Sequence, residues 1–123
     1  MKFAVIRDSI LIFFKKIALR ENHKEDFQVF NNLPEFAKIS REDKAFPLKI
    51  SVNQFCGDYE IVFSVKEKRP SLLFHDYKFN TEERNIILNY SDEIYSNWIY
   101  VAIYAKEFTH IILDLKFSGD KPT

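Results

Sequence analysis

The clearest pattern along the chain is a two-residue alternation of apolar and polar side chains in its middle part. The run 48–53 alternates in this way, and a second alternating run covers 59–66 after a turn that contains Gly57. Because neighbouring side chains of a strand point to opposite faces, this period predicts two strands with one buried face each. The short turn between them predicts an antiparallel hairpin. A third strand is expected over 72–79.

The first third of the chain shows a different period. Apolar residues recur at three- and four-residue steps between residues 8 and 20, which predicts an amphipathic helix over 8–20. Pro34 stands where the first residue of a helix is tolerated, and Phe36 and Ile39 follow at helical spacing. These positions predict a second, short helix over 34–43.

A third helix is expected over 81–95. Asn80 and Glu83 have the spacing of a capping box, in which two side chains bond the free backbone N–H groups at the start of a helix. Apolar residues then recur at helical steps as far as Trp98. The alternative for part of this region is a short strand over 86–88.

The last third returns to strand patterns. The run 98–105 is apolar on both faces, which predicts a strand covered on both sides. The run 108–117 alternates and is expected to close a second hairpin, with 118–123 as a loose tail. The element order is thus α-α-β-β-β-α-β-β. It predicts a single domain over 1–123 of the α+β class, with an antiparallel sheet of about five strands and helices on one face.

Composition excludes several classes of protein. The 18 basic and 18 acidic residues balance, so no nucleic-acid partner is expected. Two glycines are too few for the known phosphate-binding loops, and a single cysteine forms neither an internal disulfide nor a cysteine-based zinc site. Asp8 and Ser9 interrupt the N-terminal apolar run, and no run reaches the roughly 20 apolar residues that span a bilayer. We therefore expect a cytoplasmic protein with no membrane partner and no cofactor.

Charge is distributed unevenly although the total is zero. Residues 1–24 carry six basic and two acidic side chains, a net charge of +4, whereas residues 76–114 carry three basic and seven acidic ones, a net charge of −4. The expected helix 81–95 begins and ends with pairs of acidic residues, and large aromatic residues lie beside them. An aromatic centre with an acidic rim is typical of a surface that binds a basic protein. The expected partner-binding residues are Glu82, Glu83, Tyr90, Asp92, Glu93, Tyr95 and Trp98.

Two smaller features are interpreted as structural. Cys56 lies in a turn, and no cation adjoins it in sequence to make its thiol reactive. Lys66, Lys68 and Arg69 form a basic cluster that Glu67 divides, as in an ordinary solvated turn.

The three histidines give little indication of catalysis. None of His23, His75 and His110 has a second histidine or a cysteine at metal-site spacing, so no metal is expected. His75 and Asp76 are neighbours on an expected strand and would point apart, whereas His110 and Asp114 share a face and are interpreted as partner contacts. We expect no enzyme and no catalytic residue. The alternative is a small metal-independent hydrolase or nuclease that uses His75 or His110.

In composition the chain resembles bacterial immunity proteins, which are small, poor in glycine and cysteine, and rich in aromatic residues. This resemblance implies an antitoxin that neutralises a basic toxin, such as a nuclease, by direct binding. The expected order of elements also resembles that of type III secretion chaperones, which is the alternative binding function. The pattern leaves the oligomeric state open.

Overall fold

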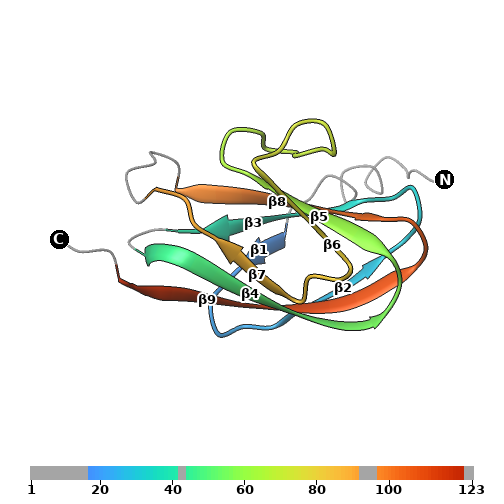
Figure 1. Cartoon of the computed structure of the whole chain (residues 1–123), viewed down its shortest axis with the longest axis horizontal. Coiled ribbons are helices and arrows are strands. Elements are labelled where there is room, and N and C mark those ends of the chain that lie inside the picture. Colours follow the sequence, from blue (N-terminus) through green and yellow to red (C-terminus); the bar gives the residue numbers. More distant parts are fainter. Residues whose placement is uncertain (1–16, 42–43, 92–96, 121–123) are drawn as a thin grey trace.

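Two β-sheets pack face to face in the computed structural model of the chain, which describes residues 17–41, 44–91 and 97–120 (Figure 1). Within these ranges the secondary structure consists of nine strands and no helix. The strands are β1 (Ile17–Leu19), β2 (Glu25–Val29), β3 (Glu35–Ser40), β4 (Lys44–Cys56), β5 (Tyr59–Ser64), β6 (Tyr77–Asn80), β7 (Asn85–Leu88), β8 (Trp98–Ala105) and β9 (Thr109–Asp120). The predicted α+β class is therefore wrong, and the fold is an all-β sandwich.

The first sheet has the strand order β1-β3-β8-β5-β6, and the second has the order β2-β9-β4-β7. All neighbouring strands are antiparallel except β1 and β3, which run parallel. Both predicted hairpins are wrong, because β4 and β5 belong to different sheets, as do β8 and β9. Their short connections cross from one sheet to the other, which brings two inward-facing apolar strands together across the core.

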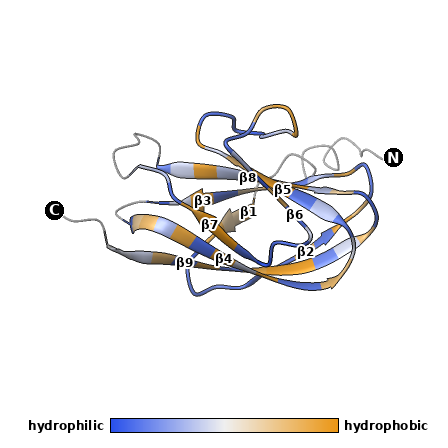
Figure 2. Cartoon of the chain, in the orientation of Figure 1, coloured by the Kyte–Doolittle hydropathy of each residue, from blue (hydrophilic) through white to orange (hydrophobic). Residues whose placement is uncertain are grey.

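The core forms where the inner faces of the two sheets meet. Alternate residues of β4 and β9 point inward and are buried, and Figure 2 shows hydrophobic and hydrophilic residues alternating along β4. Burial of these side chains, at about 1.5–3 kcal/mol each, is the main favourable term in folding. The buried positions predicted in the runs 48–53 and 108–117 are confirmed. In the run 59–66, Tyr59, Ile61 and Phe63 are buried as predicted, but Val65 is only partly buried, and the expected wet face is wrong because Ser64 is buried.

Two predicted helices are strands instead. The segment 34–43 contains β3, in which Ala37 and Ile39 point inward and are buried. For the predicted helix 8–20, only residues from 17 onward are described, and Ile17–Leu19 form β1. Residues 8–16 lie outside the described part of the chain.

The third predicted helix, over 81–95, is also wrong for its described part, 81–91, although its capping bonds are present; residues 92–95 lie outside the described ranges. The backbone N–H of Glu82 donates to Asn80 Oδ1 at 2.9 Å, and the N–H of Asn80 donates to Glu83 Oε1 at 3.2 Å. These bonds close a tight turn between β6 and β7 and start no helix. Ile86 and Leu88 then point into the core of the second sheet, which confirms the alternative of a short strand over 86–88.

Only the end of the predicted strand 72–79 forms a strand, β6. The preceding loop folds over the outer face of the first sheet, where the Tyr104 hydroxyl donates to the carbonyl of the buried Pro70 at 2.8 Å. Val62 and Ala102 pair on that outer face and are fully buried, although neither belongs to the inter-sheet core. The prediction that 98–105 is covered on both sides is thereby confirmed for the middle of β8.

The loose tail predicted to begin at residue 118 is instead, over 118–120, the end of a strand. Ser118 lies in β9, and its hydroxyl donates to the carbonyls of Ala45 at 3.1 Å and Phe46 at 2.9 Å. The tail prediction is wrong for 118–120, whereas 121–123 lie outside the described ranges. No helix with the length and hydropathy of a membrane span occurs in the ranges that the structure covers.

Candidate functional site

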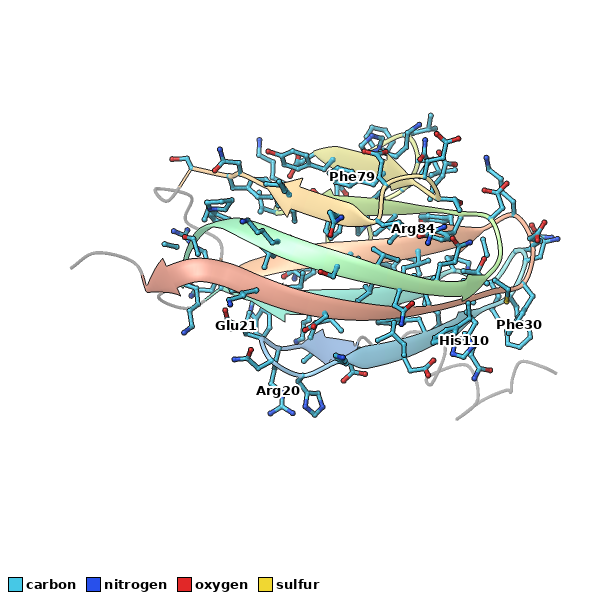
Figure 3. The ribbon with its side chains drawn as sticks, turned by 60° about the horizontal axis from the view of Figure 1, so that its bottom comes forward. Arg20, Glu21, Phe30, Phe79, Arg84 and His110 are labelled. Atoms are coloured by element: carbon cyan, nitrogen blue, oxygen red, sulfur yellow. The ribbon has the colours of Figure 1, made fainter. Side chains whose placement is uncertain are left out.

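Four rings gather on the outer face of the second sheet, at one end of the sandwich. We call them the aromatic end cluster: Phe30, Phe55, Phe108 and His110. The ring centroids of Phe30 and Phe108 lie 5.1 Å apart, and those of Phe55 and His110 lie 4.7 Å apart. Phe30, Phe55 and Phe108 are 52%, 56% and 42% exposed. Figure 3 shows Phe30 and His110 at the same end of the molecule.

The register of β2 against β9 brings Phe30 next to Phe108. Val29 pairs with Thr109, the first residue of β9. Phe30, which follows Val29, and Phe108, which precedes Thr109, are therefore neighbours. Thr109 points inward and is fully buried, and strand alternation therefore places Phe108 and His110 on the outer face.

A bulge in β4 places Phe55 against His110. Gln54 pairs with Ile111 and Cys56 pairs with His110, so Phe55 is the extra residue of a register shift. A bulge redirects a side chain and increases the local twist. Here it turns the Phe55 ring onto the imidazole.

Two tight connections hold this end of the sandwich. After β2, the N–H of Leu33 donates to the Phe30 carbonyl at 3.1 Å, and Asn32 adopts a φ of 64°, a conformation that Asn tolerates. After β4, Gly57 adopts a φ of 109°, and a Cβ at this position would overlap Thr109. The chain can therefore pass from β4 to β5 against β9 only with glycine at residue 57.

His110 is paired with a carboxylate. Its Nε2 lies 2.8 Å from Asp26 Oδ1 on the neighbouring strand β2. The sequence singled out Asp114 as the carboxylate beside His110. Asp114 does share the outer face of β9, but the hydrogen bond of the His110 ring is to Asp26. The pair is a polar border on one side of the aromatic end cluster.

The geometry around His110 does not assemble a catalytic group. Cys56 is opposite His110 in the register, so a thiol, an imidazole and a carboxylate lie along one face. Within the part of the chain that the structure describes, however, no hydrogen bond links the Cys56 sulfur to the imidazole, and the Phe55 ring contacts that imidazole. No group of three His, Cys, Asp or Glu side chains among the described residues could hold a metal ion.

The structure does not bring His75 and His110 together into one site. His75 belongs to the loop on the first sheet, where its Nδ1 lies 3.0 Å from the Ser71 carbonyl oxygen. His110 lies on the outer face of the second sheet. The two imidazoles are thus on opposite sides of the sandwich and cannot act on one substrate.

The partner-binding surface expected from the sequence is not brought together in the described residues. Glu82 and Glu83 are exposed in the turn before β7, whereas Trp98 begins β8 in the other sheet, with Lys38 Nζ 4.3 Å from the centroid of its ring. Asp92, Glu93 and Tyr95 lie outside the described ranges.

Tyr90, the remaining member of that expected surface, packs inward. Its hydroxyl donates to Asp76 Oδ2 at 2.7 Å, and its ring contacts Phe46 and Tyr77 with centroids 5.6 Å and 5.1 Å away. Burial, followed by the hydrogen bond to Asp76, raises the pKa of Tyr90 well above the usual range. Tyr90 therefore packs its partly buried ring against β4 and β6.

Sequence reasoning missed Phe30, Phe55 and Asp26. The segment 21–32 is polar except for Phe27, Val29 and Phe30, and no element was predicted there, yet Phe27 and Val29 alternate with polar residues and form the buried face of β2. That alternation was the available signal for β2 and for an exposed Asp26.

Two hollows are lined by described residues. One has a volume of about 190 Å³ and is lined by Leu19, Arg20, Glu21, Ser40, Arg41, Lys44 and Phe117. The other has a volume of about 210 Å³ and is lined by Asn32, Leu33, Pro34, Glu60, Leu72, Tyr104, Ala105 and Lys106. Small-molecule sites usually occupy roughly 300–1,000 Å³. Neither hollow reaches that size, so the exposed rings are the stronger candidate.

Comparison with known proteins identifies the fold. No protein-family model and no curated protein sequence matches the chain. Among solved structures, the chain is similar to the pre-peptidase C-terminal domain of collagenase from Bacillus anthracis, with a TM-score of 0.59 and 11% identity over 83% of this chain and 95% of that chain. This likeness shows a shared β-sandwich fold. It agrees with the correction of the predicted α+β class to an all-β fold, and it does not bear on the resemblance to immunity proteins drawn from composition.

Proposed function

We propose that this chain is a non-catalytic binding module that recognises another protein through the aromatic end cluster. The observation that carries the proposal is that three phenylalanines, each about half exposed, gather with His110 on one end of a sheet face. Water-exposed aromatic surface is unfavourable in a monomer, and contiguous apolar patches mark interaction sites.

The chemistry of the cluster supports a protein as the ligand. Aromatic side chains are enriched at the centres of protein interfaces, where they bury large areas with few rotatable bonds. Asp26 lies at the border of the rings and offers a carboxylate to a donor on the partner. A partner with an apolar patch beside an Arg or Lys side chain fits this arrangement.

The cluster is also held in place before binding. The bulge at Phe55, the paired strands β2 and β9, and the turn that follows Phe30 fix the backbone beneath each ring. A preorganised surface loses less conformational entropy when it binds, which favours affinity.

Two further considerations support a binding role without catalysis. The imidazole of His110 is engaged by Asp26 on one side and by the Phe55 ring, and these contacts leave no assembled nucleophile. The collagenase neighbour is, by its description, a C-terminal domain of an enzyme. An accessory binding domain is a role that the shared fold can serve. Toxin neutralisation is a narrower role that neither observation tests.

The experiment is affinity capture from the native cell with the double variant Phe30→Ser/Phe108→Ser. Ile87→Ser is the matched control, because Ile87 is 52% exposed on the outer face of the same sheet but lies in β7, away from the cluster. A specific partner should be retained by the wild type and by the control, and lost by the double variant. Retention of every captured protein by the double variant would contradict the proposal.

A further inference from the structure

A second apolar feature lies on the opposite side of the sandwich, in the loop between β5 and β6. Its tip consists of three consecutive apolar residues, Leu72, Leu73 and Phe74, which are 41%, 86% and 66% exposed. We call them the apolar tip. Figure 1 shows the loop rising beyond the first sheet, and Figure 2 shows a hydrophobic stretch at its end. Leu73 and Phe74 are the most exposed large hydrophobic side chains in the described ranges.

The loop holds the apolar tip in a defined shape through Ser71. The Ser71 hydroxyl oxygen accepts the N–H groups of Leu73 at 3.3 Å and Phe74 at 2.9 Å, and the Ser71 N–H donates to the Phe74 carbonyl at 2.9 Å. The imidazole of His75 completes the turn on the Ser71 carbonyl. These backbone polar groups are therefore satisfied inside the loop.

Basic residues precede the apolar tip in the same loop. Lys66, Lys68 and Arg69 are exposed, and Glu67 is the acidic residue among them; the loop's other acidic residue, Asp76, lies at its base, where its carboxylate accepts the Tyr90 hydroxyl and the Val65 N–H. The base of the loop is fixed to the sheet, because the N–H of Asp76 donates to the Phe63 carbonyl at 2.7 Å. The loop therefore presents a cationic stem and an apolar end on a firm support.

We propose that this loop binds the surface of a membrane that contains anionic lipids. The apolar tip would enter the boundary between headgroups and acyl chains, and Lys66 and Lys68 would contact the anionic headgroups. Interfacial binding of this kind combines buried apolar area with attraction between cations and anionic lipids. It needs no membrane-spanning helix, and it differs from the absence of a membrane partner expected from the sequence.

The properties of the loop favour lipid over a protein partner. A lipid environment offers no hydrogen bonds to the backbone, so internal bonds favour entry into it. The turn at Ser71 supplies such bonds to the N–H groups of Leu73 and Phe74 and to the Phe74 carbonyl. Leucine is under-represented among the residues that dominate protein interfaces, and two of the three tip residues are leucines. The charge of the loop also complements an anionic surface.

The test is co-sedimentation of the full chain with phosphatidylcholine vesicles, with and without phosphatidylserine. The wild type should bind the mixed vesicles, and added salt should weaken that binding. Leu73→Ser/Phe74→Ser should lower the partition constant at least tenfold, and Lys66→Gln/Lys68→Gln should lower it about fivefold per lysine. All four side chains are exposed, so circular dichroism should show that each variant is folded.

The matched control is Phe30→Ser/Phe108→Ser, which should bind vesicles like the wild type and so separates this proposal from the protein-binding one. Failure of the wild type to bind the mixed vesicles would overturn the proposal. Equal binding by the tip variant would do the same, as would a soluble protein whose capture depends on the apolar tip.

Discussion

Phe55 contacts His110 ring to ring, at 4.7 Å between centroids, although the residue opposite His110 in the strand register is Cys56. The register shift between Gln54 and Cys56 accounts for this contact. The bulge therefore decides that an aromatic ring, and not a thiol, meets the imidazole. The same relationship favours recognition over catalysis at this end of the sheet.

Cys56 should accordingly behave as an ordinary exposed thiol. Because no hydrogen bond joins its sulfur to His110, its alkylation by iodoacetamide should proceed at the rate of a model thiol. His110→Gln and Asp26→Asn should leave that rate unchanged within about twofold. Alkylation is followed by mass spectrometry over time. A large fall in the alkylation rate of either variant would instead indicate a thiol that the imidazole activates, and would favour the hydrolase alternative.

Gly57→Ala should be strongly destabilising. The alanine would need a φ near 109°, and its methyl group would overlap Thr109, so β4, β5 and β9 would all have to shift. We expect a loss of roughly 2–4 kcal/mol in the free energy of unfolding, measured by urea denaturation. Gly119→Ala is the control, because nothing lies within 4 Å of an added methyl group there. It should lower the free energy of unfolding clearly less than Gly57→Ala does. Equal losses would contradict the packing described for the turn.

Tyr59→Phe should not destabilise the protein. The Tyr59 side chain is fully buried, and its hydroxyl has no hydrogen-bond partner. Removing a buried polar group that lacks a partner should raise the free energy of unfolding by about 1 kcal/mol. Tyr90→Phe makes the same chemical change but removes the hydrogen bond to Asp76, so it should lower stability by a similar amount. A less stable Tyr59→Phe variant would show that its hydroxyl is bonded.

The free energy of unfolding should fall as pH rises through the weakly acidic range, because Glu35 then loses its proton. Burial raises the pKa of Glu35 above its usual value of 4.5, so the native state holds a proton that the unfolded state has already released. The stabilising effect of this proton is complete below about pH 4.5 and is lost as pH rises through the higher native pKa.

Glu35→Gln tests this assignment. At pH 7 the variant should be more stable than the wild type, by at most about 1 kcal/mol because the side chain is only partly buried. The difference should shrink towards pH 4, when thermal unfolding is followed at several pH values. A variant that is less stable at pH 7 would show that the Glu35 carboxylate has a favourable charged partner.

The sequence indicated where strands form more reliably than it indicated which strands pair with each other. Alternation in the runs 48–53 and 108–117 correctly indicated which side chains are buried, because a strand with one wet face must alternate. It does not say whether a short turn closes a hairpin or crosses between sheets. The helix predicted over 34–43 failed because Phe36 and Ile39 have helical spacing, while the buried face of β3 is formed by Ala37 and Ile39.

The candidate site was harder to predict than the strands. Phe30 and Phe108 become neighbours only through the pairing of β2 with β9, about 80 residues apart in sequence, and Phe55 reaches His110 through a bulge. Neither the pairing nor the bulge leaves a local pattern. The Asn80–Glu83 turn shows the same limit, since its capping bonds form as expected but tertiary packing of Ile86 selects a strand.

The most direct test of the binding module is an NMR titration of the isotope-labelled chain with the partner obtained by capture. Chemical-shift changes and line broadening should centre on five residues and leave Ile87 unaffected: Asp26, Phe30, Phe55, Phe108 and His110. Changes confined to the first sheet or to the loop between β5 and β6, with the aromatic end cluster unperturbed, would contradict the proposed binding surface.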